Sequence, residues 1–185
     1  MTVPPLSKRT RLLEAAGHII QTEGIERLTL DAVARVAAVS KGGLLYHFPS
    51  KDALISGLID HLIQQFDLAL QYEFDHDPMP TVPGRWIRAY VRASIPEDGD
   101  TNVVSAGLLA AVATNPSLLA PLRERFLVWQ EQAEQDGLDP AFATLIRLAV
   151  DGLWLTNLCG FAPQGTHIRQ HIRERLLLLS QEPRG

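Results

Sequence analysis

Apolar residues recur at helical spacing along most of the chain, in segments separated by proline and glycine. Residues 7–23 and 166–180 repeat them at intervals of three and four, and residues 51–74 carry one broad apolar face. Such a period is typical of amphipathic α-helices that pack one face against a core. The pattern predicts an all-α fold of about nine helices, with the others at 30–37, 41–47, 85–95, 103–114, 116–135 and 140–159.

Two short helical segments joined by a tight turn occupy residues 29–47. Thr29 and Ser40 each precede one segment and supply a hydroxyl that can cap it. The second segment carries Gly42 and Gly43, and each glycine costs a helix roughly 1 kcal/mol relative to alanine. Glycine at the exposed first turn of a helix lets another surface come close, as when a helix-turn-helix enters a DNA groove. We therefore expect a helix-turn-helix DNA-binding module.

Residues 39–54, with the sequence VSKGGLLYHFPSKDAL, resemble the recognition segment of TetR-family transcriptional regulators, which is usually close to VSKGTLYHHFPSKEAL. The resemblance implies a DNA-binding domain at 1–51, joined through a helix at 51–74 to an effector-binding and dimerisation domain at 52–185. It also implies a set of DNA-contacting residues, for which the candidates are Thr29, Ser40, Lys41, Gly42, Gly43, Leu45, Tyr46, His47 and Lys51.

Several positions in this segment and the turn before it depart from the family pattern. Gly43 stands where threonine is common, Leu45 where tyrosine is common, and Ala38 where the turn often has glycine. The threonine and tyrosine often contact DNA in the family, so their replacement changes the set of available contacts. We expect Tyr46 to take over part of the lost phosphate binding.

The net charge of −4 is unevenly distributed along the chain. Residues 1–51 hold seven Lys or Arg and four acidic residues, a balance of +3, so the remaining residues carry −7. Binding to phosphates requires positive charge on the contacting surface. The distribution favours the N-terminal segment as the DNA-contacting part, and a random scatter of a few charges is the alternative.

The last two predicted helices are rich in apolar residues. In the TetR family such helices form a four-helix dimer interface, so the resemblance implies a homodimer. Residues 140–159 are apolar on nearly every side and predict a buried helix. Leucines that merely complete the core of a single chain are the alternative explanation. The candidate interface residues are Ala149, Gly152, Thr156, Ile168, Ile172, Leu176 and Leu179.

Effectors of the family bind among the helices that follow the fourth, where an apolar cavity with a few polar groups is the usual form of a ligand site. Arg88 and Arg92 stand four apart there and either meet an anionic ligand or form a solvated face. Asp151 lies on a helix expected to be buried, so it needs a donor from a partner subunit or a ligand. The candidate pocket residues, each of which can instead belong to the core, are Trp86, Tyr90, Phe126, Trp129, Trp154 and Asn157.

Motifs for catalysis are missing, since the sequence has no nucleophile elbow, phosphate-binding loop or H-E-x-x-H pattern. His167 and His171 have the spacing of a metal-binding pair on a helix, but no cysteine or carboxylate cluster completes a site nearby. The stretch Asp75-His76-Asp77 is better explained as a polar linker. We expect no enzymatic activity, no metal and no cofactor.

A single cysteine, Cys159, excludes an internal disulfide and fits a reducing compartment. The chain has no uncharged apolar run of about 18 residues and no apolar signal core near its N-terminus. We expect a soluble cytoplasmic protein without a membrane partner.

Together these features predict a ligand-responsive transcriptional regulator. We expect a repressor that binds a palindromic double-stranded DNA operator as a homodimer and is released by a small-molecule effector. The alternative is a helical small-molecule-binding protein without sequence-specific DNA activity.

Overall fold

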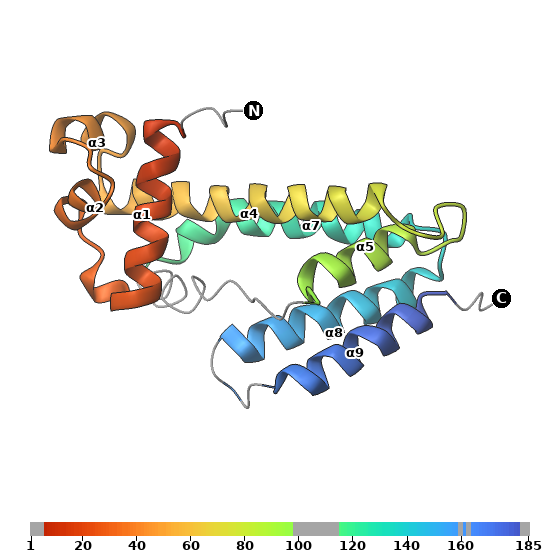
Figure 1. The fold of residues 1–185 in the computed structure, drawn as a ribbon. Helices are drawn as coiled ribbons and strands as arrows, with labels where there is room; N and C mark the ends of the chain where they lie inside the picture. The colour runs from red at the N-terminus through yellow and green to blue at the C-terminus, as the bar shows by residue number, and fades with distance from the viewer. Residues whose placement is uncertain (1–5, 98–114, 159–160, 162–163, 182–185) are drawn as a thin grey trace, which may run out of the picture. The chain divides into compact units, whose positions relative to one another are not determined.

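The computed structural model describes residues 6–97, 115–158, 161 and 164–181. Within these residues the regular structure is entirely helical, with eight α-helices and two 3₁₀ turns (Figure 1). The predicted all-α class is confirmed. The helix expected at 103–114 lies outside the described residues.

The chain divides into two compact units, residues 1–62 with 103–123 and residues 63–102 with 124–185. The division falls within α4, which runs from Lys51 to Asp75. The other helices of the first unit are α1 (Lys8–Glu23), α2 (Leu30–Val36) and α3 (Lys41–His47), with 3₁₀ turns at Ile25–Arg27 and Pro116–Leu119. The second unit contains α5 (Arg85–Ser94), most of α7 (Ala120–Glu134), α8 (Pro140–Leu158) and α9 (Thr166–Leu179).

Hydroxyl side chains cap the N-termini of helices in the first unit. The side chain of Thr29 accepts from the backbone N–H of Ala32 at 3.1 Å, and that of Ser50 accepts from Ala53 at the same distance. Both caps satisfy amide donors that have no partner inside the helix. Gly24 ends α1 with φ of +89°, a backbone conformation in which a side chain would be strained. The helix ends predicted at these positions are confirmed.

The core of the first unit joins its three N-terminal helices, since α1 contacts both α2 and α3 and α2 contacts α3. Phe48, just after α3, is buried against α4 at Gly57. A Cβ added to Gly57 would lie 2.6 Å from Cε1 of Phe48. This glycine therefore lets the ring seat against the helix. Among the described residues of this unit, the apolar residues with no exposed surface are Leu12, Leu13, Ala16, Leu28, Val33, Leu44 and Leu54.

Helix α5 is the centre of the second unit, where it contacts both α8 and α9. Its first turn is capped from far along the chain by Asp136, whose carboxylate accepts from the backbone N–H groups of Trp86 at 2.7 Å and Ile87 at 2.8 Å. Burial raises the pKa of Asp136, and these two hydrogen bonds oppose that rise. The cap fixes the position of Trp86 at the start of the helix.

Arg88 is not on a solvated face, and Asp77 does not belong to an exposed linker. Both side chains are fully buried and form an ion pair of 2.6 Å, and Arg92 approaches the other oxygen of Asp77 at 3.0 Å. Burial alone would raise the pKa of Asp77, but the hydrogen bonds from Arg88 and Arg92 hold it below its ordinary value. The aspartate that we expected in a polar linker and the two arginines that we expected on a helix surface or at a ligand therefore form a buried charged cluster.

Helix α8 is not buried on all sides within the single chain. Ala143 and Val150 face the core, whereas Leu145 is 64% exposed and Leu148 and Leu155 are also exposed. Burying an aliphatic side chain of this size stabilises a fold by roughly 1.5–3 kcal/mol. In the single chain these three leucines do not contribute that stabilisation, because they lie exposed along one side of the helix.

Candidate functional site

Helix α3 presents one side to solvent and packs the other into the first unit. Ser40 caps it by accepting from the backbone N–H of Gly43 at 3.2 Å. Leu44 is completely buried and holds the helix in place, whereas Tyr46 is 85% exposed and Leu45 is also exposed. A short helix held by one leucine thus carries an aromatic side chain outward into solvent.

The cation on α3 is held by the neighbouring helix. The ammonium of Lys41 lies 2.9 Å from Oδ1 of Asp31 in the first turn of α2. Both side chains are largely exposed, so solvent screens the pair and it contributes little to stability. The ion pair therefore orients Lys41 without burying its charge.

The two glycines of α3 differ in their surroundings. A Cβ added to Gly42 would meet nothing within 4 Å, whereas a Cβ on Gly43 would lie 3.0 Å from Cγ1 of Val39 and 3.2 Å from the capping Oγ of Ser40. In the preceding turn Ala38 has φ of +52°, a conformation that favours glycine. Gly42 is thus free of intramolecular packing demands, and Gly43 belongs to the cap.

The remaining candidate DNA contacts lie at the ends of helices. Thr29 is exposed and caps α2, and Lys51 is exposed as the first residue of α4. His47 is half-buried, with its ring edge-on to Tyr46 at a centroid distance of 5.2 Å. The structure therefore leaves Thr29 and Lys51 accessible and holds His47 between its aromatic neighbours Tyr46 and Phe48.

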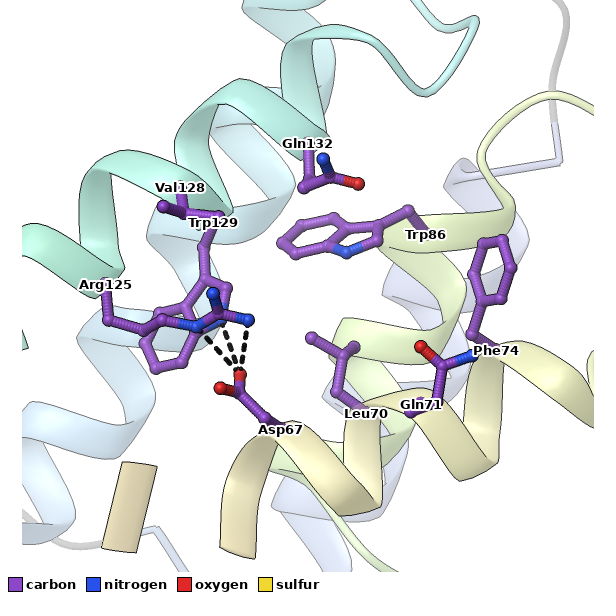
Figure 2. A pocket seen from close by; sticks show the side chains of 9 residues that line it. All are labelled: Asp67, Leu70, Gln71, Phe74, Trp86, Arg125, Val128, Trp129 and Gln132. Atoms are coloured by element: carbon purple, nitrogen blue, oxygen red, sulfur yellow. Dashed lines mark hydrogen bonds and ion pairs between the residues drawn. The ribbon is translucent and has the colours of Figure 1, made fainter. Parts of the chain in front are cut away.

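The second unit contains a pocket of about 240 Å³ (Figure 2). The lining residues on α4 are three or four positions apart, and so are those on α7. Each set therefore lies on one face of its helix. Of the predicted pocket residues, Trp86 and Trp129 line this pocket. Its other lining residues are Asp67, Leu70, Gln71 and Phe74 from α4, and Arg125, Val128 and Gln132 from α7.

An ion pair marks one edge of the pocket. Oδ1 of Asp67 accepts from Arg125, 2.8 Å from its Nη2 and 3.0 Å from its Nε, and from the indole N–H of Trp129 at 3.0 Å. Figure 2 shows these side chains converging on the carboxylate. Neither charged residue was predicted from the sequence as part of a pocket. Their helical spacing relative to Leu70 and Trp129 is the signal that could have indicated them.

The other aromatic candidates surround the pocket rings without lining the pocket. Tyr90 stacks on Trp86 with a centroid distance of 5.1 Å, and Phe126 lies edge-on to Trp129 at the same distance. Trp154 is exposed and Asn157 is half-buried on α8, and neither lines the pocket. Tyr90 and Phe126 thus support the pocket, and the two α8 residues lie elsewhere.

Asp151 finds its hydrogen-bond donors inside its own chain, not on a partner or a ligand. Tyr90 donates to Oδ1 at 2.5 Å, and Nη1 of Arg147 contacts Oδ2 at 2.6 Å. Burial raises the pKa of Asp151, while the contacts with Tyr90 and Arg147 lower it in part. Burial, together with the neighbouring carboxylate, raises the pKa of Tyr90 so far that its hydroxyl remains a donor. The network joins α5 to α8.

The candidate dimer residues fall on both sides of their helices. Ala149, Gly152 and Ile168 are exposed, and Thr156, Ile172 and Leu179 are half-buried. Leu176 is already buried by its own chain. Besides Trp154 and Ile168, the exposed large apolar side chains of α8 and α9 are Leu145, Leu148, Leu155 and Leu178.

The rings of His167 and His171 lie edge-on at a centroid distance of 4.2 Å. Among the residues that the structure describes, no group of three or more His, Cys, Asp or Glu side chains could hold a metal ion. In the same part of the chain, no helix combines the length and apolar character needed to cross a bilayer.

Several curated proteins match part of the chain. HTH-type transcriptional regulator EthR of Mycolicibacterium smegmatis is 31% identical over 83 residues, covering 44% of this chain and 36% of EthR. Nucleoid occlusion factor SlmA of Photorhabdus laumondii is 38% identical over 74 residues, covering 37% of each protein. The matches thus span little more than a third of these relatives.

Solved structures match along nearly the whole chain. A transcriptional regulator from Rhodococcus sp. Rha1 has a TM-score of 0.72 at 22% identity, covering 94% of this chain and 95% of that one. Multidrug binding protein EbrR, in complex with ethidium, has a TM-score of 0.62 at 22% identity, covering 92% and 98%. At this identity the likeness shows a shared fold.

Two family models match consecutive parts of the chain. Residues 12–58 match the bacterial regulatory proteins of the tetR family, a region that includes α2 and α3. Residues 84–181 match the tetracyclin repressor-like C-terminal domain, which covers the helices from α5 to α9. The chain belongs to the TetR family of transcriptional regulators.

Proposed function

We propose that this chain is a repressor that binds a palindromic operator as a homodimer and releases it when a small molecule binds in the second unit. The observation that carries the proposal is the exposed surface of α3, on which Tyr46 and Lys41 reach solvent and the surroundings of Gly42 are open. A helix of this kind is suited to the major groove, whose edges distinguish all four base pairs.

Each candidate contact has a proposed part in DNA binding. Lys41 and Lys51 bind phosphates, and Tyr46 donates its hydroxyl to a phosphate or a base edge. Gly42 allows the backbone of α3 to approach the groove closely. The remaining candidates border the contact surface. They are the helix-capping residues Thr29 and Ser40, together with Gly43, Leu45 and His47.

The exposed apolar side of α8 supports the homodimer. Leu145, Leu148 and Leu155 are uncovered in the single chain, and a second copy applied through a two-fold axis would bury them. A two-fold dimer presents two recognition helices to half-sites about 34–36 Å apart. The palindromic operator follows from this symmetry.

Release by a ligand is proposed from the course of α4. This helix begins three residues after Phe48 and its second half lines the pocket with Leu70 and Phe74. A ligand that binds better to one arrangement of α4 shifts the population towards it by its differential affinity. EbrR, described as a multidrug binding protein and solved with ethidium and malachite green, supports a ligand-binding role for this fold.

The test begins with selection of DNA from a random-sequence library, followed by gel-shift assays of the selected sites. We expect a palindromic consensus and a steep loss of affinity with salt, because several phosphate contacts release counterions. The variants Tyr46→Ala and Lys51→Ala should weaken operator binding and leave ligand binding intact. Failure to select any palindrome would show that the protein is not a site-specific repressor.

A further inference from the structure

Trp86 carries an unused hydrogen-bond donor at the edge of the pocket. The residue as a whole is only 7% exposed, its indole nitrogen still reaches solvent in the pocket, and the indole N–H of a buried tryptophan usually finds an acceptor. Trp129 follows this rule, since its N–H donates to Asp67. Among the hydrogen bonds within the described residues, Trp86 uses its backbone N–H, which donates to Asp136, and its indole N–H donates to none.

The indole N–H of Trp86 is directed into the pocket. In Figure 2 its nitrogen lies on the ring edge that faces Leu70 and the centre of the pocket. The ring itself cannot turn away easily, because Tyr90 stacks on it at 5.1 Å and Asp136 fixes the backbone of α5 at this residue. A donor held in this position suits a ligand that brings an acceptor.

The remaining walls define the size and the character of that ligand. Trp86, Trp129, Phe74, Leu70 and Val128 give the pocket aromatic and aliphatic surfaces, which favour flat apolar compounds. Its volume of about 240 Å³ lies below the range of roughly 300–1,000 Å³ usual for drug-sized ligands. It exceeds a cavity of about 150 Å³ that holds benzene. One or two fused rings fit this space.

The charges at the pocket edge favour a neutral ligand. Asp67 and Arg125 are 2.8 Å apart and neutralise each other, and the other polar lining residues, Gln71 and Gln132, are uncharged. An anion near Arg125 would meet the carboxylate of Asp67, and a cation near Asp67 would meet the guanidinium. A charged ligand of either sign would therefore find only a side chain that is already paired with its own counter-ion.

We propose that this pocket binds an uncharged aromatic compound of one or two rings that carries a carbonyl oxygen, and that the indole N–H of Trp86 donates to this oxygen. The inference rests on the proposed ligand-responsive function and names the class of its effector. The aromatic walls provide most of the affinity, and Trp86 provides the preference for a carbonyl compound over a hydrocarbon.

The test compares four naphthalene derivatives of similar size in the full-length protein. Methyl naphthyl ketone has the acceptor, ethylnaphthalene lacks it, naphthoate adds a negative charge and protonated naphthylmethylamine adds a positive one. One hydrogen bond contributes roughly three- to tenfold in affinity, so the ketone should bind that much more tightly than ethylnaphthalene. Both charged compounds should bind more weakly than the ketone.

Heteronuclear NMR of the three indole N–H groups identifies the residue responsible. The ketone should move the Trp86 indole proton downfield, ethylnaphthalene should not, and Trp154, which does not line the pocket, should change with neither. In Trp86→Phe the preference for ketone over hydrocarbon should fall to nearly one. If this variant does not fold, the spectra of the unmodified protein still decide the question.

Equal binding of ketone and hydrocarbon, tighter binding of either charged compound, or an unshifted Trp86 indole would overturn the inference. Binding of none of the four compounds would also overturn it. Gel shifts with the selected operator are run on the same preparation without ligand. Operator binding by a protein that ignores all four compounds would refute the effector class alone, whereas ketone binding without operator binding would refute the repressor function alone.

Discussion

Lys41 of α3 and Asp31 of α2 form an ion pair, with 2.9 Å between the ammonium nitrogen and Oδ1 of the carboxylate. A DNA phosphate that approaches Lys41 has to compete with this carboxylate and is repelled by it. We predict that Asp31→Asn increases operator affinity roughly three- to tenfold at low salt, with a smaller gain at high salt because ions screen the repulsion. Fluorescence anisotropy with labelled operator measures both values.

Glu23→Gln is the matched control for this substitution. It removes one negative charge from the last residue of α1, and its effect on operator affinity should stay below about twofold. Equal gains from the two variants would mean that net charge alone matters and that the ion pair has no special role.

Substitution of Gly42 should have opposite effects on the stability of the fold and on operator affinity. A Cβ at this position meets nothing within 4 Å, and alanine is better than glycine in a helix by about 1 kcal/mol. Gly42→Ala should therefore raise the free energy of unfolding by up to about 1 kcal/mol, measured in urea. The same variant should bind the operator more weakly, because the added methyl group projects into the groove. Unchanged operator affinity would contradict the proposed close approach.

Gly57 should respond to the same substitution in the opposite direction. Its Cβ would lie 2.6 Å from the ring of Phe48, which is buried. We predict that Gly57→Ala lowers the free energy of unfolding by about 1–3 kcal/mol, as overpacking of a core does. Thermal melting monitored by circular dichroism measures the loss, with Gly42→Ala as the control. A stabilised Gly57→Ala variant would show that Phe48 moves aside at little cost.

The buried cluster of Asp77, Arg88 and Arg92 predicts a specific dependence of stability on pH. Asp77→Asn leaves the buried guanidinium of Arg88 without its counter-ion, which should cost about 3–5 kcal/mol at neutral pH. The pKa of Asp77 is held below its ordinary value of 3.8. Its stabilising contribution is therefore complete above that value and is lost as the pH falls through the lowered pKa.

Urea midpoints measured from neutral to acidic pH test this sign. The difference in free energy of unfolding between the unmodified protein and Asp77→Asn should be constant above about pH 5 and shrink in more acidic solution. A difference that grows on acidification would mean that the folded state protonates Asp77 more readily than the unfolded chain does.

Helix ends could be predicted from the sequence because the hydrogen bonds that cap them join near neighbours. Ser40 and Ser50 each reach an amide three residues ahead, and such pairs are visible as a hydroxyl residue before an apolar period. The cap on α5 has no such signal, since Asp136 is 50 residues from Trp86. Only the folded chain brings them together.

The pocket, too, could be predicted only in part from the sequence. Aromatic residues indicated where the second unit has its core, and Trp86 and Trp129 do line the pocket. Asp67 and Arg125 are 58 residues apart, and residue types alone do not reveal that their helices face each other. The buried arginine was misread for a related reason. Arg88 and Arg92 at a spacing of four suggest an exposed face, and the aspartate that pairs with both of them precedes their helix.

The turn between α4 and α5 is built around one guanidinium. Arg88 donates to the carbonyls of Met79 at 2.9 Å, Val82 at 3.0 Å and Pro83 at 2.7 Å, and it reaches Ser180 at 3.3 Å just after α9. Most surface turns accept inserted residues because their carbonyls can turn to water. Here an insertion would leave a carbonyl facing the protein interior without a donor. The length of this connection is therefore fixed by a single side chain, and relatives that keep this arginine should vary in length elsewhere.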